Sequence, residues 1–122
     1  MFDFKGKVAV VTGGARGIGK CICDKFREAG AEVCVIDLLH NGYFTGDLSD
    51  KATLEDFAKK VIGEYGQVDY LINNAAPKMC GITDGSYEDF EYALKVGVSA
   101  PFYLSKLFAP HFSEGASIVN IS

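Results

Sequence analysis

The feature that most constrains this chain is a glycine-rich turn between a predicted strand and a predicted helix. Residues 8–11 are Val-Ala-Val-Val, and such a run is typical of a strand buried on both faces of a parallel sheet. After the turn, apolar residues recur at helical spacing until Gly30, a residue type that favours a left-handed helix end. They are Ile18, Cys21, Ile22, Phe26 and Ala29. The turn therefore precedes a helix N-terminus, where unpaired N–H groups and the helix dipole favour an anion.

The spacing of the glycines indicates which anion the turn binds. Gly13, Gly17 and Gly19 follow the pattern T-G-x-x-x-G-x-G. Glycines so placed make a tight turn, let the backbone approach a pyrophosphate and let a helix pack closely on a strand. A glycine cluster alone would also fit a loop without a ligand, but the strand before it, the helix after it and an acid downstream favour a dinucleotide. The pattern resembles that of the short-chain dehydrogenase/reductase family, whose sugar-nucleotide epimerases place the glycines differently, as T-G-x-x-G-x-x-G.

The composition argues against several other classes of protein. The formal net charge is −4, so the chain lacks the basic surface that nucleic acid or an anionic membrane requires. No apolar run approaches the roughly 20 residues that span a bilayer, and residues 1–5 lack the basic-then-apolar order of a signal peptide. The four cysteines show no C-x-x-C spacing, which favours free thiols in the cytoplasm and predicts no metal site.

A second predicted strand, residues 32–37, ends in the acid Asp37. This residue lies 20 positions beyond Gly17, the separation expected of the carboxylate that binds the adenosine ribose of a dinucleotide. A carboxylate accepts hydrogen bonds from two ribose hydroxyls and repels a 2′-phosphate, so Asp37 favours NAD over NADP. Arg16 in the glycine turn argues more weakly for NADP, because a guanidinium would suit that phosphate. The alternative is that Asp37 only ends the strand.

The connection over residues 38–46 has scarcely room for the helix that most family members carry between their second and third strands. Either residues 43–45 pair marginally or the third strand is degenerate. Ser49 is then expected to cap an amphipathic helix that ends at Gly66. Asp47 and Leu48 match the acidic residue and apolar neighbour that contact adenine in the family; the alternative is that Asp47 is only a helix-entry acid.

A fourth predicted strand, residues 68–72, continues into Asn73-Asn74-Ala75-Ala76. The family's motif here is N-N-A-G, so Ala76 departs from it by one methyl group and makes the expected site slightly tighter. The resemblance implies that small residues let this segment approach the ribose and nicotinamide, while the two amides brace neighbouring strands. Outside this context Asn-Asn would indicate only a turn.

The remainder of the chain predicts a capped, interrupted helix and a fifth strand. Residues 86–89, Ser-Tyr-Glu-Asp, form a capping-box pattern. Gly97 stands at the position of the family's asparagine, and Pro101 is expected to free the Gly97 carbonyl and bend the helix. Residues 117–122 predict a strand buried on both faces. The apolar repeat of the helix consists of Phe90, Ala93, Leu94, Val98, Leu104, Leu107 and Phe108.

Alternation of strands and helices predicts an α/β fold with a doubly wound parallel (Rossmann) sheet, in the order 3-2-1-4-5. We expect residues 1–122 to form a single NAD-binding domain that contains the N-terminal five-strand portion of the family's fold and is incomplete at its C-terminal end. The cofactor would lie across the switch point between strands 1 and 4. The expected cofactor-binding residues are Gly13, Arg16, Gly17, Ile18, Gly19, Asp37, Asp47, Leu48, Asn74, Ala75 and Ala76.

The resemblance also implies an activity for the full-length protein. It would be an NAD-dependent oxidoreductase that transfers hydride between nicotinamide and a small-molecule alcohol or carbonyl, as a homodimer or homotetramer. Its catalytic serine would follow residues 120–122, Asn-Ile-Ser, and its Y-x-x-x-K pair would come later, so we expect no catalytic residue in this chain. The chain would then bind the cofactor without turnover. The alternative is a dinucleotide-binding or assembly module without a catalytic role.

Overall fold

Five parallel strands form the sheet of the computed structural model, which describes residues 2–122; Met1, the first residue of the N-terminal segment considered above, lies outside them. The strands are β1 (Val8–Thr12), β2 (Glu32–Asp37), β3 (Phe44–Thr45), β4 (Val68–Asn73) and β5 (Phe112–Asn120). They pair in the order β3-β2-β1-β4-β5, which confirms the predicted doubly wound α/β fold. The order reverses between β1 and β4, so a crevice is expected at their carboxyl ends.

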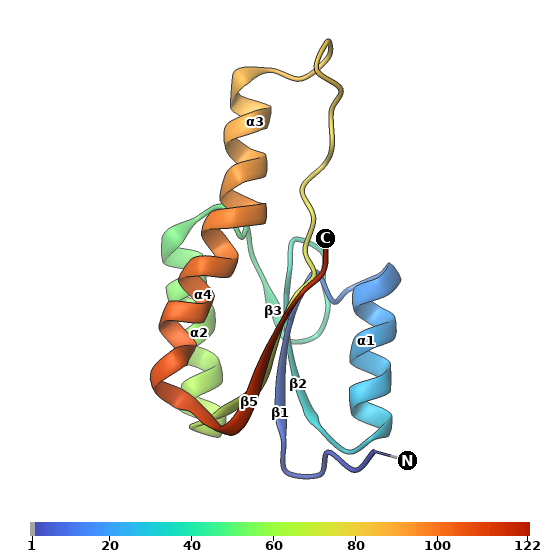
Figure 1. Cartoon of the computed structure of the whole chain (residues 1–122), viewed down its shortest axis with the longest axis vertical. Coiled ribbons are helices and arrows are strands. Elements are labelled where there is room, and N and C mark those ends of the chain that lie inside the picture. Colours follow the sequence, from blue (N-terminus) through green and yellow to red (C-terminus); the bar gives the residue numbers. More distant parts are fainter. Residues whose placement is uncertain (1) are drawn as a thin grey trace.

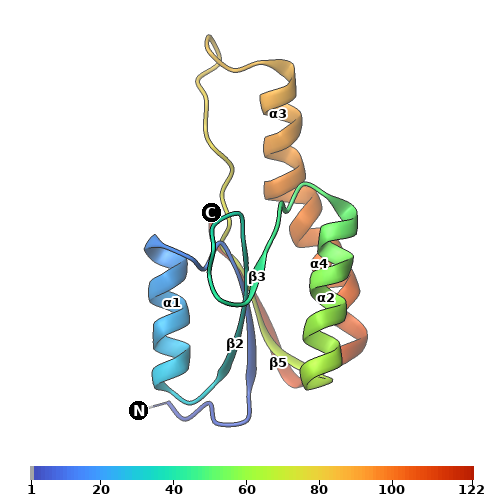
Figure 2. The same cartoon turned by 180° about the vertical axis from the view of Figure 1, so that it is seen from behind.

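Helices lie on both faces of the sheet. α1 (Gly17–Glu28) covers one face, and α2 (Lys51–Tyr65) and α4 (Ala100–Phe108) cover the other, as Figure 1 and Figure 2 show. α3 (Tyr87–Leu94) precedes α4 in the chain and projects beyond the carboxyl edge of the sheet (Figure 1). Within residues 2–122, no helix has the length and apolar character needed to cross a membrane.

The larger hydrophobic core lies between the sheet and the layer formed by α2 and α4. Phe57 of α2 and Phe108 of α4 are fully buried and meet edge to face, with ring centroids 6.2 Å apart. Burying a phenylalanine side chain stabilises a fold by about 1.5–3 kcal/mol, so this layer anchors the strands from which the cleft residues project. The strand residues packed in this core include Val10, Ile36 and Leu71. The smaller core beneath α1 consists of Val11, Cys23, Val35 and Ile72.

Two predicted helix ends are confirmed. α2 ends at Gly66, whose φ of 73° lies in the left-handed region that glycine adopts without strain. α3 begins with the predicted capping box: the Asp89 N–H donates to Ser86 Oγ at 3.1 Å, and the Ser86 N–H donates to Asp89 Oδ2 at 2.9 Å. The hydrogen bonds at Asp89 also lower the pKa of its carboxyl below the ordinary value, the backbone N–H of Ser86 contributing most.

The prediction that Ser49 caps α2 is wrong. The Ser49 N–H donates to Asp47 Oδ1 at 2.8 Å, which places Ser49 inside a local turn that precedes the helix. Asp50 occupies the N-cap position instead, with extended backbone, and α2 starts one residue later. Side-chain hydrogen bonds of an aspartate to the backbone two residues on are common in turns, and here that bond shifts the helix start by one position.

The third strand exists but is short, which decides between the two alternatives for residues 43–45. Phe44 and Thr45 pair with the last two residues of β2, Ile36 and Asp37. The loop before β3 is held by the Asn41 side chain, whose Nδ2 donates to Phe44 O at 2.9 Å and whose Oδ1 accepts from the following backbone. This local network brings the chain back to the sheet without an intervening helix.

The helix after residue 86 is interrupted where Pro101 predicts, but its first half is not buried. Residues Lys95–Ser99 form a π-helical segment, and the axis changes direction between α3 and α4 (Figure 1). The apolar repeat does not bury α3, which projects past the sheet and contains no buried residue. The exposed members of the predicted repeat are Phe90, Leu94 and Val98.

β5 differs from its prediction in both length and burial. It begins at Phe112 rather than at residue 117, because residues before an irregularity in the ladder also run beside β4. The residues that the sequence predicts to be buried on both faces are partly exposed within residues 2–122: Ile118 is 45% exposed and Val119 43% exposed. β5 lies at the edge of the sheet, so the described residues give it a partner on one side only.

Candidate functional site

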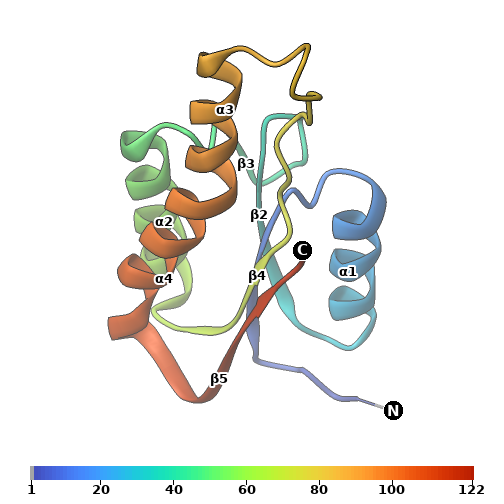
Figure 3. The same ribbon diagram turned by 45° about the horizontal axis from the view of Figure 1, so that its top comes forward.

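A cleft of about 680 Å³ lies at the carboxyl edge of the sheet, where the strand order reverses. Figure 3, with the top of the molecule turned forward, shows the segments that leave β1, β2 and β4 at this edge. All the predicted site residues except Asp47 line the cleft. The lining therefore includes Gly13, Arg16, Gly17, Ile18, Gly19, Asp37, Leu48, Asn74, Ala75 and Ala76.

The glycine turn packs against the segment after β4 so closely that a side chain would not fit. A Cβ atom on Gly13 would lie 2.9 Å from Ala75 Cα, and Gly13 also has a left-handed φ of 68°. A Cβ on Gly19 would overlap Gly13 O and lie 2.5 Å from Asn74 Nδ2. The first N–H groups of α1 have no intrahelical acceptor, so the turn presents backbone donors at a helix N-terminus.

Thr12 and Asn74 join the ends of β1 and β4. The N–H groups of Asn74 and Ala75 both donate to Thr12 Oγ1, each at 3.0 Å. In return Asn74 Nδ2 donates to the carbonyls of Thr12 and Gly13, each at 3.2 Å. These bonds hold the glycine turn and the Asn-Ala segment together at the floor of the cleft. We did not predict this role of Thr12, although its place directly before the glycine pattern was the available signal.

Asp37 ties the glycine turn to the loop after β2. Its Oδ2 accepts the Ala15 N–H at 3.0 Å, and its Oδ1 accepts the Leu39 N–H at 2.9 Å. Each carboxylate oxygen has a second lone-pair site, so both can still accept a hydrogen bond from a ligand in the cleft. The carboxylate is thus fixed in orientation by two backbone donors before any ligand binds.

Asp47 is half-buried next to the cleft and does not line it. Its Oδ1 accepts hydrogen bonds from the Ser49 N–H at 2.8 Å and from the Tyr92 hydroxyl at 3.1 Å. Burial by itself raises the pKa of the Asp47 carboxyl, but these donors outweigh it and hold the pKa below its ordinary value. Burial and the Asp47 carboxylate raise the pKa of Tyr92, so the tyrosine stays protonated and donates.

The sequence analysis missed six residues of the lining. Four of them directly follow predicted motifs, two after Asp37 and two after Ala76, so adjacency was the available signal. The other two lie one helical turn apart on the helix after residue 86, where the apolar pattern gave no indication that they face a ligand site. The six are Leu38, Leu39, Pro77, Lys78, Tyr92 and Val96.

The side chains of Arg16 and Lys78 place two positive charges on the cleft lining. Both are exposed, and neither takes part in an ion pair with another residue of 2–122. Together with the backbone donors of the glycine turn they favour an anionic ligand. Within residues 2–122, no group of three or more His, Cys, Asp or Glu side chains is arranged to hold a metal ion.

Comparison with known proteins gives one consistent family. The family model described as short chain dehydrogenase matches residues 7–122. The D-threitol dehydrogenase of Mycolicibacterium smegmatis is 30% identical, in an alignment that covers 99% of this chain and 55% of the relative. The chain thus spans about half the length of the curated relatives that it matches.

Solved structures with a similar fold are enzymes of the same kind. An apo SCOR enzyme from Clostridium thermocellum superimposes with a TM-score of 0.87 at 38% identity, covering 97% of this chain and 54% of the other. A short chain dehydrogenase from Burkholderia cenocepacia in complex with NADP gives a TM-score of 0.85 at 27% identity, covering 96% of this chain and 55% of the other. The alignment of sequence and the arrangement of strands therefore point to the same group of proteins.

Proposed function

The chain belongs to the short-chain dehydrogenase/reductase family, and from this premise we propose that it binds NAD in the cleft as the cofactor-binding part of an oxidoreductase. The observation that carries the proposal is the meeting of the glycine turn, Asp37 and Asn74 around one cleft at the strand switch point. When bound, the nicotinamide accepts or supplies a hydride.

The residues present fit a dinucleotide. Gly13 and Gly19 let the turn pack directly on the segment after β4, while a Cβ on Gly17 would meet nothing within 4 Å, so the backbone there is open to a pyrophosphate. The N-terminus of α1 and the Arg16 guanidinium would stabilise the phosphate charge. Asp37, at the end of β2, would accept from the hydroxyls of the adenosine ribose, and the segment from Asn74 to Ala76 would adjoin the nicotinamide half.

The proposed reaction is hydride transfer between this cofactor and a small-molecule alcohol or carbonyl. The name of one relative, D-threitol dehydrogenase, supports this class. The serine and the Tyr-Lys pair that would orient the substrate oxygen and move its proton belong to the half of the family's length that this chain does not span. We further propose a homodimer or homotetramer, to which the exposed apolar side chains of α3 would contribute, and a reducing cytoplasm, which suits four free cysteines.

Asp37 is the basis for proposing NAD rather than NADP. Its carboxylate is held in place by the Ala15 and Leu39 N–H groups, so it cannot turn away from a 2′-phosphate without losing those bonds. Like charges brought together in a desolvated contact cost on the order of several kcal/mol. The NADP complex of the Burkholderia cenocepacia relative and the position of Arg16 are the observations that favour NADP, and the affinities for the two cofactors test the assignment.

Asp37→Ala is expected to weaken NAD binding by about 10- to 100-fold, because hydrogen bonds to a charged group contribute about 1.5–3 kcal/mol. It is also expected to strengthen NADP binding, since the repulsion is removed. Titration calorimetry of both cofactors with both proteins measures this, with Asp56→Ala, an exposed acid of α2, as the matched control. Tighter binding of NADP than of NAD by the unmutated chain would refute the NAD assignment, and no binding of either would refute the proposed function.

A further inference from the structure

Tyr92 of α3 stands between the cleft and the Asp47 carboxylate. The tyrosine lines the cleft, while its hydroxyl donates to Asp47 Oδ1 at 3.1 Å. Asp47 itself does not line the cleft, although its neighbour Leu48 does. The carboxylate therefore holds a residue of the cleft lining by a hydrogen bond without being part of that lining.

Tyr92 joins α3 to the rest of the molecule, because it packs against the larger hydrophobic core and donates to Asp47. α3 contains no buried residue and projects beyond the sheet (Figure 3). Among residues 2–122, the Tyr92–Asp47 bond is the one side-chain hydrogen bond that joins α3 to a residue outside its own capping turn. Asp47 is held in turn by the Ser49 N–H at 2.8 Å, so both ends of the bond are placed by other contacts.

The position of Tyr92 identifies which half of a dinucleotide it would meet. Asp37, at the end of β2, marks the adenosine ribose in this type of fold. Asp47 and Leu48 follow β3, which lies on the far side of β2 from the switch point. The wall formed by Leu48 and Tyr92 is therefore on the adenosine side, and the nicotinamide half belongs on the β4 side.

We infer that the Tyr92 ring forms the wall against which the adenine base packs, and that Asp47 is a positioning residue that holds this ring by its hydroxyl. The inference rests on the proposed function, because it assumes that the cleft takes a dinucleotide. Aromatic side chains pack well against any base, and a ring held by an ionised acceptor loses little freedom on binding. The low pKa of Asp47 and the high pKa of Tyr92 keep that pair in its hydrogen-bonded form at neutral pH.

The test is calorimetric titration of the chain with NAD and with ADP-ribose, which lacks the nicotinamide ring. Tyr92→Ala removes the wall and is expected to lower the affinity for both ligands by the same factor, about 10- to 100-fold. Tyr92→Phe keeps the ring but removes its hydrogen bond to Asp47, and its affinity for both ligands is expected to fall by about 2- to 10-fold. Tyr103→Phe is the matched control, because the Tyr103 hydroxyl donates to Glu55 Oε2 at 2.6 Å in another part of the molecule. Tyr87→Ala, an exposed tyrosine of α3, controls for the loss of a ring.

A double variant separates positioning from direct contact. If Asp47 acts through Tyr92, then Asp47→Ala lowers affinity in the unmutated chain but costs nothing further in the Tyr92→Phe background. A full additional loss in that background would show that Asp47 meets the adenine itself and would overturn the inference, as would unchanged ADP-ribose binding by Tyr92→Ala. Both results leave the proposed function standing. Failure of the unmutated chain to bind either ligand would overturn the proposed function and the inference together. Binding of ADP-ribose but not of NAD would overturn only the proposed function.

Discussion

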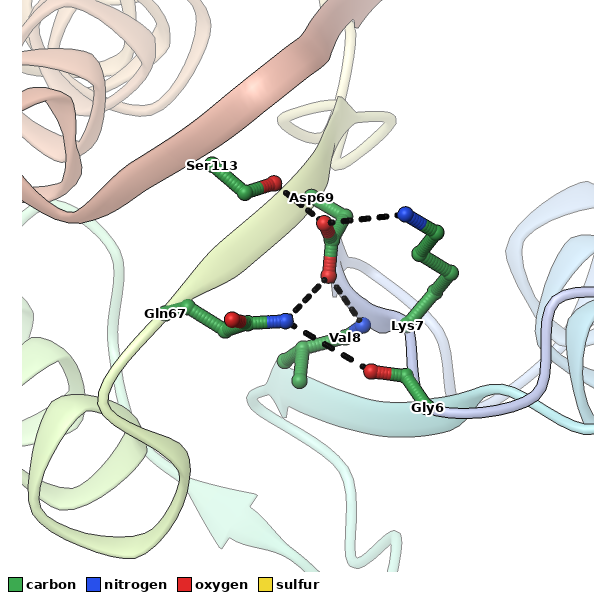
Figure 4. Close-up of polar contacts among 6 residues, drawn as sticks. All are labelled: Gly6, Lys7, Val8, Gln67, Asp69 and Ser113. Atoms are coloured by element: carbon green, nitrogen blue, oxygen red, sulfur yellow. Dashed lines mark hydrogen bonds and ion pairs between the residues drawn. The ribbon is translucent and has the colours of Figure 1, made fainter.

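Replacing Asp69 by alanine is expected to lower the free energy of unfolding by about 3–5 kcal/mol, because it leaves one buried and two partly buried donors without this acceptor. Asp69 lies in β4, is 2% exposed, and joins three strands at the amino edge of the sheet (Figure 4). It accepts the Val8 N–H at 2.8 Å and Gln67 Nε2 at 3.1 Å, and it also accepts the Ser113 hydroxyl. Lys7 Nζ lies 3.9 Å away and balances the charge.

An isosteric change tests the chemical reason for this effect. In Asp69→Asn the amide oxygen can still accept from the Val8 N–H and Gln67 Nε2, and the new N–H₂ can donate to Ser113 Oγ, because a hydroxyl accepts as well as donates. The variant therefore loses only the charge on these bonds, and its loss of stability should be about 1–2 kcal/mol, clearly smaller than that of the alanine variant. Urea unfolding followed by circular dichroism measures both, and Asp56→Ala provides an exposed acid as the control. A loss of stability in Asp69→Asn as large as that in Asp69→Ala would contradict the account, because it would show that the set of hydrogen bonds to this side chain is not what stabilises the fold.

Asp69 also illustrates which features of the fold the sequence predicts and which it does not. The central strands were predictable because runs such as residues 8–11 and 32–37 are apolar on both faces and are followed by glycine or acid at the expected places. The same pattern gives no indication that Asp69, the second residue of 68–72, is buried. Two of the groups that donate to its carboxylate, the Val8 N–H and the Ser113 hydroxyl, lie more than 40 positions away in the sequence. Such pairings depend on tertiary contacts that no local spacing encodes.

The edges of the structure were harder to predict for a related reason. An apolar repeat marks one face of a helix or strand, but not whether another element lies against it. Phe90 and Ile118 belong to such repeats and are nevertheless exposed. The cleft was predicted well where a glycine or an amide has a required backbone role, as at Gly13 and Asn74, and missed at Tyr92, which reaches the cleft only because α3 passes above β3 and the start of α2.

Gly19→Ala is expected to remove most of the dinucleotide affinity of the cleft, by about 100-fold or more. The new methyl group would overlap Gly13 O and lie 2.5 Å from Asn74 Nδ2, and the carbonyl belongs to the backbone of the turn. The turn or the start of α1 must then move, which displaces the N–H groups that would bind the pyrophosphate, and each such charge-assisted bond contributes about 1.5–3 kcal/mol. Crowding of this kind also destabilises a fold by about 1–3 kcal/mol.

The control for Gly19→Ala is another helical glycine with open space around it. A Cβ on Gly63 of α2 would meet nothing within 4 Å, so Gly63→Ala should leave NAD affinity unchanged and stabilise the chain by about 0.5–1 kcal/mol, since alanine has the higher helix propensity. Calorimetric titration with NAD and urea unfolding of both variants measure the two effects. Because the two substitutions add the same methyl group to a helix, equal NAD affinities would show that close contact between the turn and the segment after β4 is not what shapes the cleft for its ligand.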